Sequence, residues 1–296
     1  MRVFLSGAAS HLAQVLLPKL CAQAEVSAVL GIDLQASNFS HPKFTQHMAD
    51  IRNPEIAQWM PGHDALVHLA FVVLRGKMAA MTMHDINVQG TRQLFEAAHH
   101  AGIARMVHLS SAAVYGDGKN LTENAAFRPL PGLLYARHKA QVETWMDEAF
   151  PEAVRLRPHI ILGPHCQPLL AKILRQPCYV TLDEPQPPLQ CVHEEDVAQA
   201  IIASLLRPAS GPINLAAPGS YSFKQAIQQR HTHPLSISFS AAKMALSLTW
   251  RLTGFGGEPA WLDGIRHPLT LDCSRATQVL AWQPQYDVQA TLASVK

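Results

Sequence analysis

A serine, a tyrosine and a lysine have the types and spacing needed to move a hydride on and off an alcohol carbon. Tyr135 and Lys139 are four residues apart, so on a helix the phenol and the ammonium lie on one face. A neighbouring cation favours phenolate and lowers the pKa of tyrosine from about 10, which makes a proton shuttle near neutral pH. Ser111, at the end of a predicted strand, can hydrogen-bond the same substrate oxygen.

The segment after the first predicted strand has the spacing of a dinucleotide-binding turn. Gly7 takes the place of the glycine that makes the bend, and Ala13 that of the small residue that packs helix on strand. His11 and Leu12 lie between them at the start of the helix and are expected to contact the cofactor. Ser10 stands where such turns place a second glycine, so its Cβ is expected to crowd the pyrophosphate and weaken binding.

Two acidic positions fit the adenosine half of such a cofactor. Asp33, at the end of the second predicted strand, can accept both ribose hydroxyls of NAD and repel the 2′-phosphate of NADP, so NAD is favoured. The alternative for Asp33 is an ordinary turn residue at a strand end. Asp50 and Ile51 are expected to bracket the adenine, unless they belong to a surface loop. At the other end of the cofactor, the positively charged nicotinamide ring would act together with Lys139 to lower the pKa of Tyr135.

Composition limits the class of protein. The chain has 296 residues, 48% of them hydrophobic, which is enough for a large core and at most two domains. Its net charge of +2 leaves no electrostatic footprint for nucleic acid. The first residues resemble a strand more than a signal peptide, and no stretch is long enough to span a membrane, so we expect a cytoplasmic protein without a membrane partner. Scattered cysteines and histidines predict reduced thiols and no metal site.

Short apolar runs alternate with segments of helical period through the first two thirds of the chain. This alternation predicts an α/β Rossmann fold, a doubly wound parallel sheet with helices on both faces. The predicted strands are Arg2–Leu5, Val26–Asp33, Lys43–Met48, Ala65–Leu69, Arg105–Ser110 and Ala153–Arg157, and the predicted helices are His11–Ala24, Pro54–Met60, Met81–His100 and Tyr135–Ala149. We expect residues 1–164 to form the nucleotide-binding domain, with contributions from about 190–215, and residues 165–296 to form mainly a small substrate lobe.

The order and spacing of these segments resemble the extended short-chain dehydrogenase/reductase family, specifically its NAD-dependent epimerase/dehydratase branch, over nearly the whole chain. The matching segments also include Val67–Ala70, Asn87–Thr91, Arg155–Pro164, Val192–Ala198 and Ala281–Pro284. The resemblance implies that Ser111, Tyr135 and Lys139 are the catalytic trio and that Lys139 binds the nicotinamide ribose. It also implies that Ser110 caps the strand beneath, and that the cofactor pocket is lined by Leu69, Ala70, Asn87, Pro158 and His159. His193 and Asp196 could form an acid-base pair, but the resemblance favours a structural role at the start of a helix.

The trio serves more than one reaction. The expected function is hydride transfer at a nucleotide-sugar, like that of a UDP-sugar 4-epimerase. The alternatives are a dehydrogenase or reductase of a non-sugar alcohol or ketone, and a weakly active regulatory protein that binds a dinucleotide. Ala112 and Ala113 stand where family dehydratases carry an acidic pair, which argues against dehydration. Arg266 is the preferred ligand for the diphosphate of such a substrate; the alternative is that it is solvated or salt-bridged. Because the stretch Ala241–Leu252 is apolar, an apolar alcohol or ketone remains a possible substrate.

The resemblance also implies a homodimer joined by two helices from each chain. The helices Met81–His100 and Tyr135–Ala149 carry apolar residues at helical spacing, namely Leu94, Ala97, Ala98, Val142, Trp145 and Met146. Such faces could pair with their copies in a four-helix interface. The alternative is that they pack on the sheet of one chain.

Overall fold

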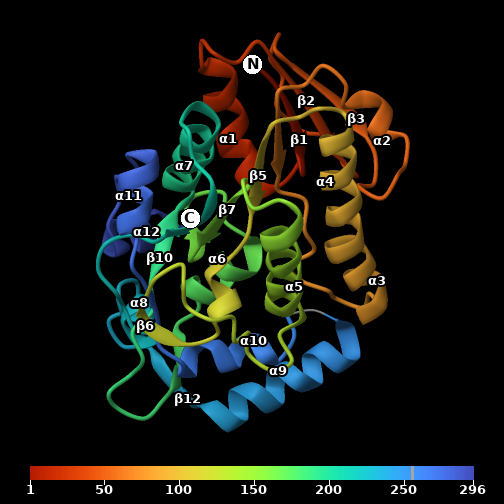
Figure 1. Cartoon of the computed structure of the whole chain (residues 1–296). Helices are drawn as coiled ribbons and strands as arrows, with labels where there is room; N and C mark the ends of the chain where they lie inside the picture. The colour runs from red at the N-terminus through yellow and green to blue at the C-terminus, as the bar shows by residue number, and fades with distance from the viewer. Residues whose placement is uncertain (255–256) are drawn as a thin grey trace.

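A seven-stranded parallel sheet forms the centre of the molecule (Figure 1). The structure, a computed structural model, describes residues 1–254 and 257–296. The strands lie in the order β3-β2-β1-β4-β5-β7-β11, and their bounds are β1 Arg2–Ser6, β2 Ala28–Asp33, β3 Phe44–Met48, β4 Ala65–His68, β5 Arg105–Leu109, β7 Val154–Pro158 and β11 Gly211–Leu215. The predicted α/β class and doubly wound sheet are confirmed.

Helices cover both faces of the sheet because parallel strands need crossover connections. On one face lie α1 (His11–Ala22), α7 (Glu194–Leu206) and α11 (Ser274–Leu280), and on the other lie α2 (Ile56–Trp59), α4 (Thr91–His100) and α5 (Leu134–Ala149). Each face carries its own cluster of buried apolar side chains. The central strands β1 and β4 are therefore buried on both sides and read as apolar runs, whereas the edge strand β3 is partly exposed and more polar.

The predicted helix Met81–His100 is divided in the structure. It consists of α3 (Ala80–His84), a π-helical segment η1 (Asp85–Gly90) and α4. Asn87 lies in the π segment, fully buried, where its side chain accepts a hydrogen bond from Val72 N and donates one to Val72 O. The wider turn thus coincides with the point where the helix is tied to the loop after β4.

The apolar residues expected at a dimer interface lie inside one chain. Leu94 and Ala98 of α4, and Val142 and Met146 of α5, are buried in the cluster beneath these helices, and Ala97 and Trp145 pack against its edge. The four buried side chains are therefore not available as a dimer surface, and the pairing of these helices in a homodimer stays a prediction. Helical spacing identifies an apolar face but does not say whether a sheet or another chain covers it.

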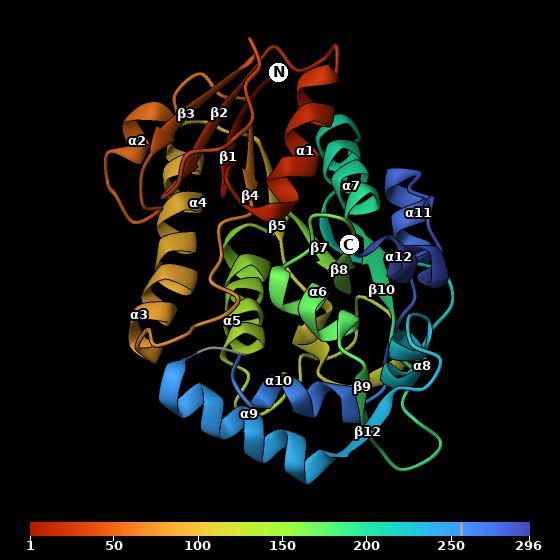
Figure 2. The ribbon, with the colours of Figure 1, turned by 180° about the vertical axis from the view of Figure 1, so that it is seen from behind.

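A second lobe lies beside the carboxyl edge of the sheet, built mostly from segments after β7 together with η2 and β6, which precede it (Figure 2). Its strands form three parallel pairs, β6 (Gly118–Leu121) with β13 (Leu269–Leu271), β8 (Ile160–Leu162) with β10 (Cys191–His193), and β9 (Cys178–Thr181) with β12 (Leu235–Ser238). Its helical segments are η2 (Ala112–Tyr115), α6 (Pro168–Arg175), α8 (Phe223–Gln228), α9 (Phe239–Thr253), α10 (Ala260–Asp263), η3 (Gly264–Arg266) and α12 (Val288–Ser294). Across the described residues, no helix is long and apolar enough to cross a bilayer.

The start of α7 anchors the C-terminal part of the chain. The side chain of His193 caps α7 by accepting from Glu195 N, and its ring stacks on Tyr286 with centroids 3.7 Å apart. The buried carboxylate of Asp196 accepts from the backbone N–H groups of Gln285 and Tyr286, and Trp282 Nε1 donates to Asp196 O. The predicted structural role of His193 and Asp196 is confirmed.

Replacing Asp196 by alanine removes the acceptors of two backbone donors. We expect the free energy of unfolding to fall by about 1–3 kcal/mol, the usual cost of leaving such groups unsatisfied. Asp196→Asn keeps one acceptor oxygen and should lose less. Asp117→Ala changes an exposed carboxylate and should stay within about 0.5 kcal/mol of the parent. Urea unfolding measures all three, and equal stability of Asp196→Ala and the parent would contradict the anchoring role.

Candidate active site

The carboxyl ends of the parallel strands bring the predicted site residues to one edge of the sheet. Gly7 follows β1, Asp33 ends β2, Leu69 follows β4, Ser111 follows β5 and Pro158 ends β7. Ligands of open α/β sheets bind at this edge. The predicted site residues, although far apart in the sequence, therefore lie along the same edge of the sheet.

The turn after β1 admits only glycine at its bend. Gly7 has a φ of +79°, and a Cβ built there would lie 2.6 Å from Ala70 N. The α1 helix begins four residues later, so the N–H groups of His11 and Leu12 have no acceptor within the helix. Free N–H groups at a helix N-terminus form an anion site. This cradle fits the pyrophosphate of a dinucleotide.

Ser10 has a local role that the sequence did not reveal. It is the N-cap of α1, with extended backbone, and its hydroxyl accepts a hydrogen bond from Ala13 N. Serine is among the residues that stabilise a helix start best. The serine at this position is thus explained by capping, and its predicted effect on cofactor affinity stays a prediction.

The residues predicted for the adenosine half are held by protein partners. Asp33 is half-buried, and its two carboxylate oxygens accept from Ala9 N at 2.9 Å and Gln35 N at 3.2 Å. It therefore links the end of β2 to the glycine turn. The Asp50 carboxylate is bound by Arg52, which holds the pKa of Asp50 below its usual range. Ile51 is buried, close enough to Gly90 that a Cβ there would meet its side chain at 2.8 Å.

The remaining predicted pocket residues differ in exposure. Leu69 is buried and Ala70 is half-buried beside the glycine turn. Pro158 and His159 are buried at the end of β7, and burial lowers the pKa of His159 to about 4. Asn87 was expected to line the pocket, but its side chain is fully buried against the backbone of Val72. It supports the loop after β4, and its predicted place in the cofactor pocket stays a prediction.

The candidate catalytic trio lies where η2 meets α5. Ser111 is the N-cap of η2, where its hydroxyl accepts from Ala113 N, and its side chain is near enough to Tyr135 to favour the ionised phenol and lower its pKa. One turn further along α5, the buried ammonium of Lys139 donates to Leu109 O, the last carbonyl of β5. The three predicted residues are thus brought together, although the roles predicted for them are untested.

Without a cofactor, the surroundings of Tyr135 shift its pKa upward. Desolvation raises the pKa of Tyr135 to about 12, and the Ser111 side chain opposes this only in part. Burial also holds the pKa of Lys139 well below its usual value, while the Glu143 carboxylate acts in the opposite direction. A low-dielectric environment disfavours both charged forms. The predicted lowering of the tyrosine pKa included a positively charged nicotinamide ring and stays a prediction; residue spacing did not show that Lys139 is buried and Tyr135 half-buried.

A buried ion network beneath the trio was missed from the sequence. Glu143, four residues after Lys139 on α5, is fully buried and receives Arg157 of β7 at 2.6 Å and the hydroxyl of Ser110. Arg157 also donates to the hydroxyl of Tyr115 at 2.7 Å. Ser110 was expected to cap the strand, and it joins this network instead. The i+4 and i+8 spacing of Lys139 and Glu143 from Tyr135 was the available signal.

Two aromatic rings next to Tyr135 were also missed. Phe71 meets the Tyr135 ring edge to face at 5.7 Å, and Lys139 Nζ lies 3.5 Å from the Phe71 ring centroid. Trp261 of α10 approaches Tyr135 from the second lobe, with centroids 5.6 Å apart. The surroundings of the phenol are therefore largely apolar. Arg266, predicted to bind a diphosphate, is exposed on η3 with its guanidinium 4.7 Å from the Phe239 ring.

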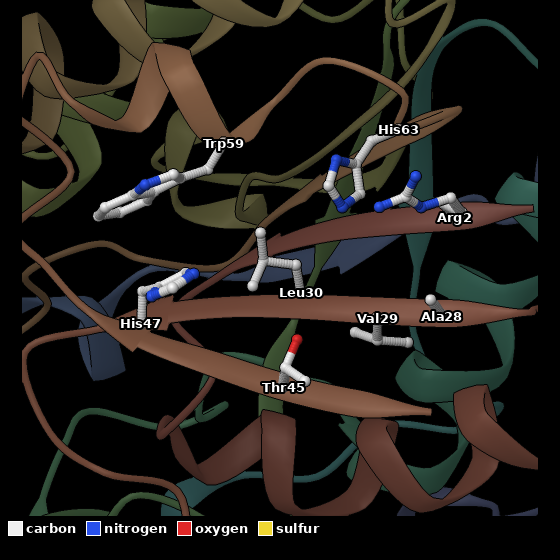
Figure 3. Close-up of a pocket in the computed structure, with 8 residues that line it drawn as sticks. All are labelled: Arg2, Ala28, Val29, Leu30, Thr45, His47, Trp59 and His63. Atoms are coloured by element: carbon white, nitrogen blue, oxygen red, sulfur yellow. The ribbon is translucent and has the colours of Figure 1, made fainter. Parts of the chain in front are cut away.

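A depression of about 310 Å³ lies elsewhere on the sheet (Figure 3). It is lined by Arg2, Ala28, Val29, Leu30, Thr45, His47, Trp59 and His63. Because Arg2 and Ala28 are the first residues of β1 and β2, the depression lies toward the edge opposite Ser111. It contains none of the trio and is not part of the candidate active site.

Fold and site together define a dinucleotide-binding Rossmann protein with a Ser-Tyr-Lys constellation. The sequence model of the NAD dependent epimerase/dehydratase family matches residues 3–216. The chain belongs to this family, so it is an NAD-dependent enzyme of the extended short-chain dehydrogenase/reductase type, as the sequence predicted.

Individual relatives are more distant. An N-acetyl-alpha-D-glucosaminyl-diphospho-ditrans,octacis-undecaprenol 4-epimerase of Escherichia coli O157:H7 is 30% identical over 182 residues, 59% of this chain and 53% of the epimerase. A 4-hydroxy-2-methyl-3-oxo-4-farnesyl-3,4-dihydroquinoline-1-oxide ketoreductase of Stigmatella aurantiaca is 31% identical over 172 residues, 55% of this chain and 51% of that enzyme. These alignments span about half of each relative. The structure of MoeE5 in complex with UDP-glucose and NAD has a TM-score of 0.79 at 19% identity, covering 100% of this chain and 97% of MoeE5.

Replacing Glu143 by glutamine keeps the side-chain shape but removes the only carboxylate bound by Arg157 among the described residues. We expect the free energy of unfolding to fall by about 3–5 kcal/mol, because Arg157 is left as an unpaired buried charge. Glu148→Gln, on the exposed side of the same helix, is the matched control and should change it by less than about 0.5 kcal/mol. Urea unfolding of the two variants decides the point, and similar losses would show that the network is not stabilising.

Asp33→Ser should narrow the preference for NAD over NADP by at least about tenfold. Two charges 4 Å apart interact by roughly 1–4 kcal/mol at the dielectric of a protein surface, so losing the carboxylate relieves repulsion of the 2′-phosphate. Fluorescence titrations with both cofactors give the ratio of dissociation constants, and Asp117→Ser is the exposed control. A parent protein that prefers NADP would refute the assignment of Asp33.

Proposed function

We propose that the protein catalyses reversible hydride transfer at an alcohol carbon of a nucleotide-sugar, in the manner of a UDP-sugar 4-epimerase. One observation carries the proposal: Tyr135 and Lys139 lie one helical turn apart on α5, and Ser111, at the carboxyl edge of the sheet, is near enough to the phenol to favour its ionised form. The family, the similarity to the E. coli 4-epimerase and the likeness to MoeE5 bound to UDP-glucose support it.

The cofactor is held by the segments that end the first strands. Gly7 gives the turn its bend, and His11 and Leu12 present backbone N–H groups to the phosphates. Asp33 accepts the ribose hydroxyls of the adenosine half, and Lys139 binds the nicotinamide ribose. Bound NAD supplies the hydride acceptor and a positively charged ring.

Tyr135 moves the proton that accompanies the hydride. As phenolate it removes the proton from the substrate hydroxyl, and as phenol it returns a proton to the ketone oxygen. Ser111 donates a hydrogen bond to the same oxygen and so fixes its position. The apolar rings of Phe71 and Trp261 exclude water from the phenol, which strengthens these polar contacts.

A second candidate is a dehydrogenase or reductase that acts on an apolar alcohol or ketone. The observation in its favour is the pair of aromatic rings around Tyr135, and the similarity to the farnesyl-quinoline ketoreductase supports it. Turnover separates the candidates. Interconversion of UDP-glucose and UDP-galactose without net NADH supports an epimerase. Stoichiometric NADH formed or consumed with an apolar substrate supports the second candidate.

Tyr135→Phe keeps the ring and its packing but removes the ionisable hydroxyl. We expect turnover to fall by at least about a hundredfold, the usual scale for lost acid-base catalysis, with the unfolding midpoint nearly unchanged. Tyr179→Phe on β9 is the matched control and should retain turnover. Steady-state rates on the same substrate test this, and a near-normal rate in Tyr135→Phe would exclude Tyr135 as the acid-base group.

A further inference from the structure

The α9 helix presents an apolar face to solvent. Met244, Leu248 and Leu252 are spaced four residues apart and are 71%, 58% and 68% exposed. Leu235 of the preceding β12 strand is 70% exposed. Side chains at this spacing form one stripe along a helix. Surface helices normally bury their apolar stripe against the core, whereas α9 exposes this stripe to solvent.

Polar and aromatic contacts determine which face of α9 points inward. Lys243 forms an ion pair with Asp263 of α10 at 2.7 Å, and Trp250 lies under the guanidinium of Arg75 at 4.9 Å. Both views show α9 along the outside of the second lobe, with α10 between it and the body of the molecule (Figures 1 and 2). The contacts of Lys243 and Trp250 therefore fix the orientation of α9 about its axis, with the apolar stripe facing outward.

Along the chain from α9 to the end of η3, the charged side chains without an ion pair are basic. Both charged residues of α9 are basic. The two carboxylates between α9 and the end of η3, Glu258 and Asp263, are each held in an ion pair. By contrast Lys77, Arg251 and Arg266 are exposed and form no ion pair among residues 1–254 and 257–296. Apolar side chains flanked by free cations complement an anionic lipid surface.

The size of the face argues against a second copy of the chain as its partner. The helix has 15 residues, so it is about 22 Å long and about 10 Å wide, and its face offers roughly 220 Å². Stable protein interfaces bury about 800 Å² on each partner. A bilayer has no such minimum, because an amphipathic helix needs only to immerse its apolar face among the headgroups.

We propose that α9, with Leu235, is a peripheral membrane-docking surface that binds anionic bilayers. The sequence predicted no membrane partner because no segment can span a bilayer, and docking through one helix face requires no span. Trp261 of α10 contacts Tyr135, so docking holds the candidate active site one helical layer above the lipid.

Flotation of the full-length protein with vesicles of phosphatidylglycerol and phosphatidylethanolamine tests the proposal without any substrate. The double variant Met244→Gln/Leu248→Gln should reduce the partition coefficient at least tenfold. The matched control Leu34→Gln/Met48→Gln removes one leucine and one methionine of similar exposure elsewhere and should bind as the parent does. Because all four residues are exposed, the unfolding midpoints should agree.

Charge supplies a second arm of the test. Arg251→Gln or raised salt should weaken binding several-fold, and vesicles of phosphatidylcholine alone should bind less protein. A parent protein that does not float with anionic vesicles overturns the proposal, and so does equal flotation of the two double variants. A dimeric mass in light scattering that Met244→Gln/Leu248→Gln converts to a monomer also overturns it, since a second copy would then cover the face.

Discussion

One buried carboxylate connects the parts of this molecule that form the candidate active site. Glu143 lies on the same helix as Tyr135 and Lys139, binds Arg157 at the end of β7 and accepts from Ser110, the residue before Ser111. It therefore ties the helix with the phenol and ammonium to the strand ends with the serine. It is also the carboxylate that favours the charged form of Lys139. Position and charge in the site depend on the same group.

Burial makes the chemistry of this site depend on its cofactor. The protein alone raises the pKa of Tyr135 to about 12 and lowers that of Lys139, so its surroundings disfavour the charged form of both groups. The aromatic rings of Phe71 and Trp261 contribute to this apolar environment. An added positive charge has a large effect where the dielectric is low. The site is thus arranged so that a cationic ring, rather than the lysine alone, would produce the phenolate.

The sequence predicted what depends on local pattern. Six strands were predicted from their short apolar or alternating runs, and the proximity of Ser111, Tyr135 and Lys139 was predicted because strand ends converge and residues four apart share a helix face. It did not predict β11, which begins with Gly211 and Pro212, or the Glu143–Arg157 pair, which needs a helix and a strand to meet. The burial of Leu94, Ala98, Val142 and Met146 within one chain was not predicted, because helical spacing does not identify what covers an apolar face. The upward shift of the Tyr135 pKa by the protein alone was not predicted, because desolvation is a tertiary property.

The dependence of the Tyr135 pKa on the cofactor is tested most directly by titrating Tyr135 with and without NAD. Ultraviolet difference absorbance of tyrosinate, titrated upward from neutral pH, compares the parent with Tyr135→Phe. We expect one tyrosine of the parent protein to ionise below the ordinary pKa of about 10 when NAD is present. Without NAD, the same tyrosine should ionise above that value. That signal should be missing from Tyr135→Phe. An unchanged titration on adding NAD, or the same signal in both proteins, would contradict the account.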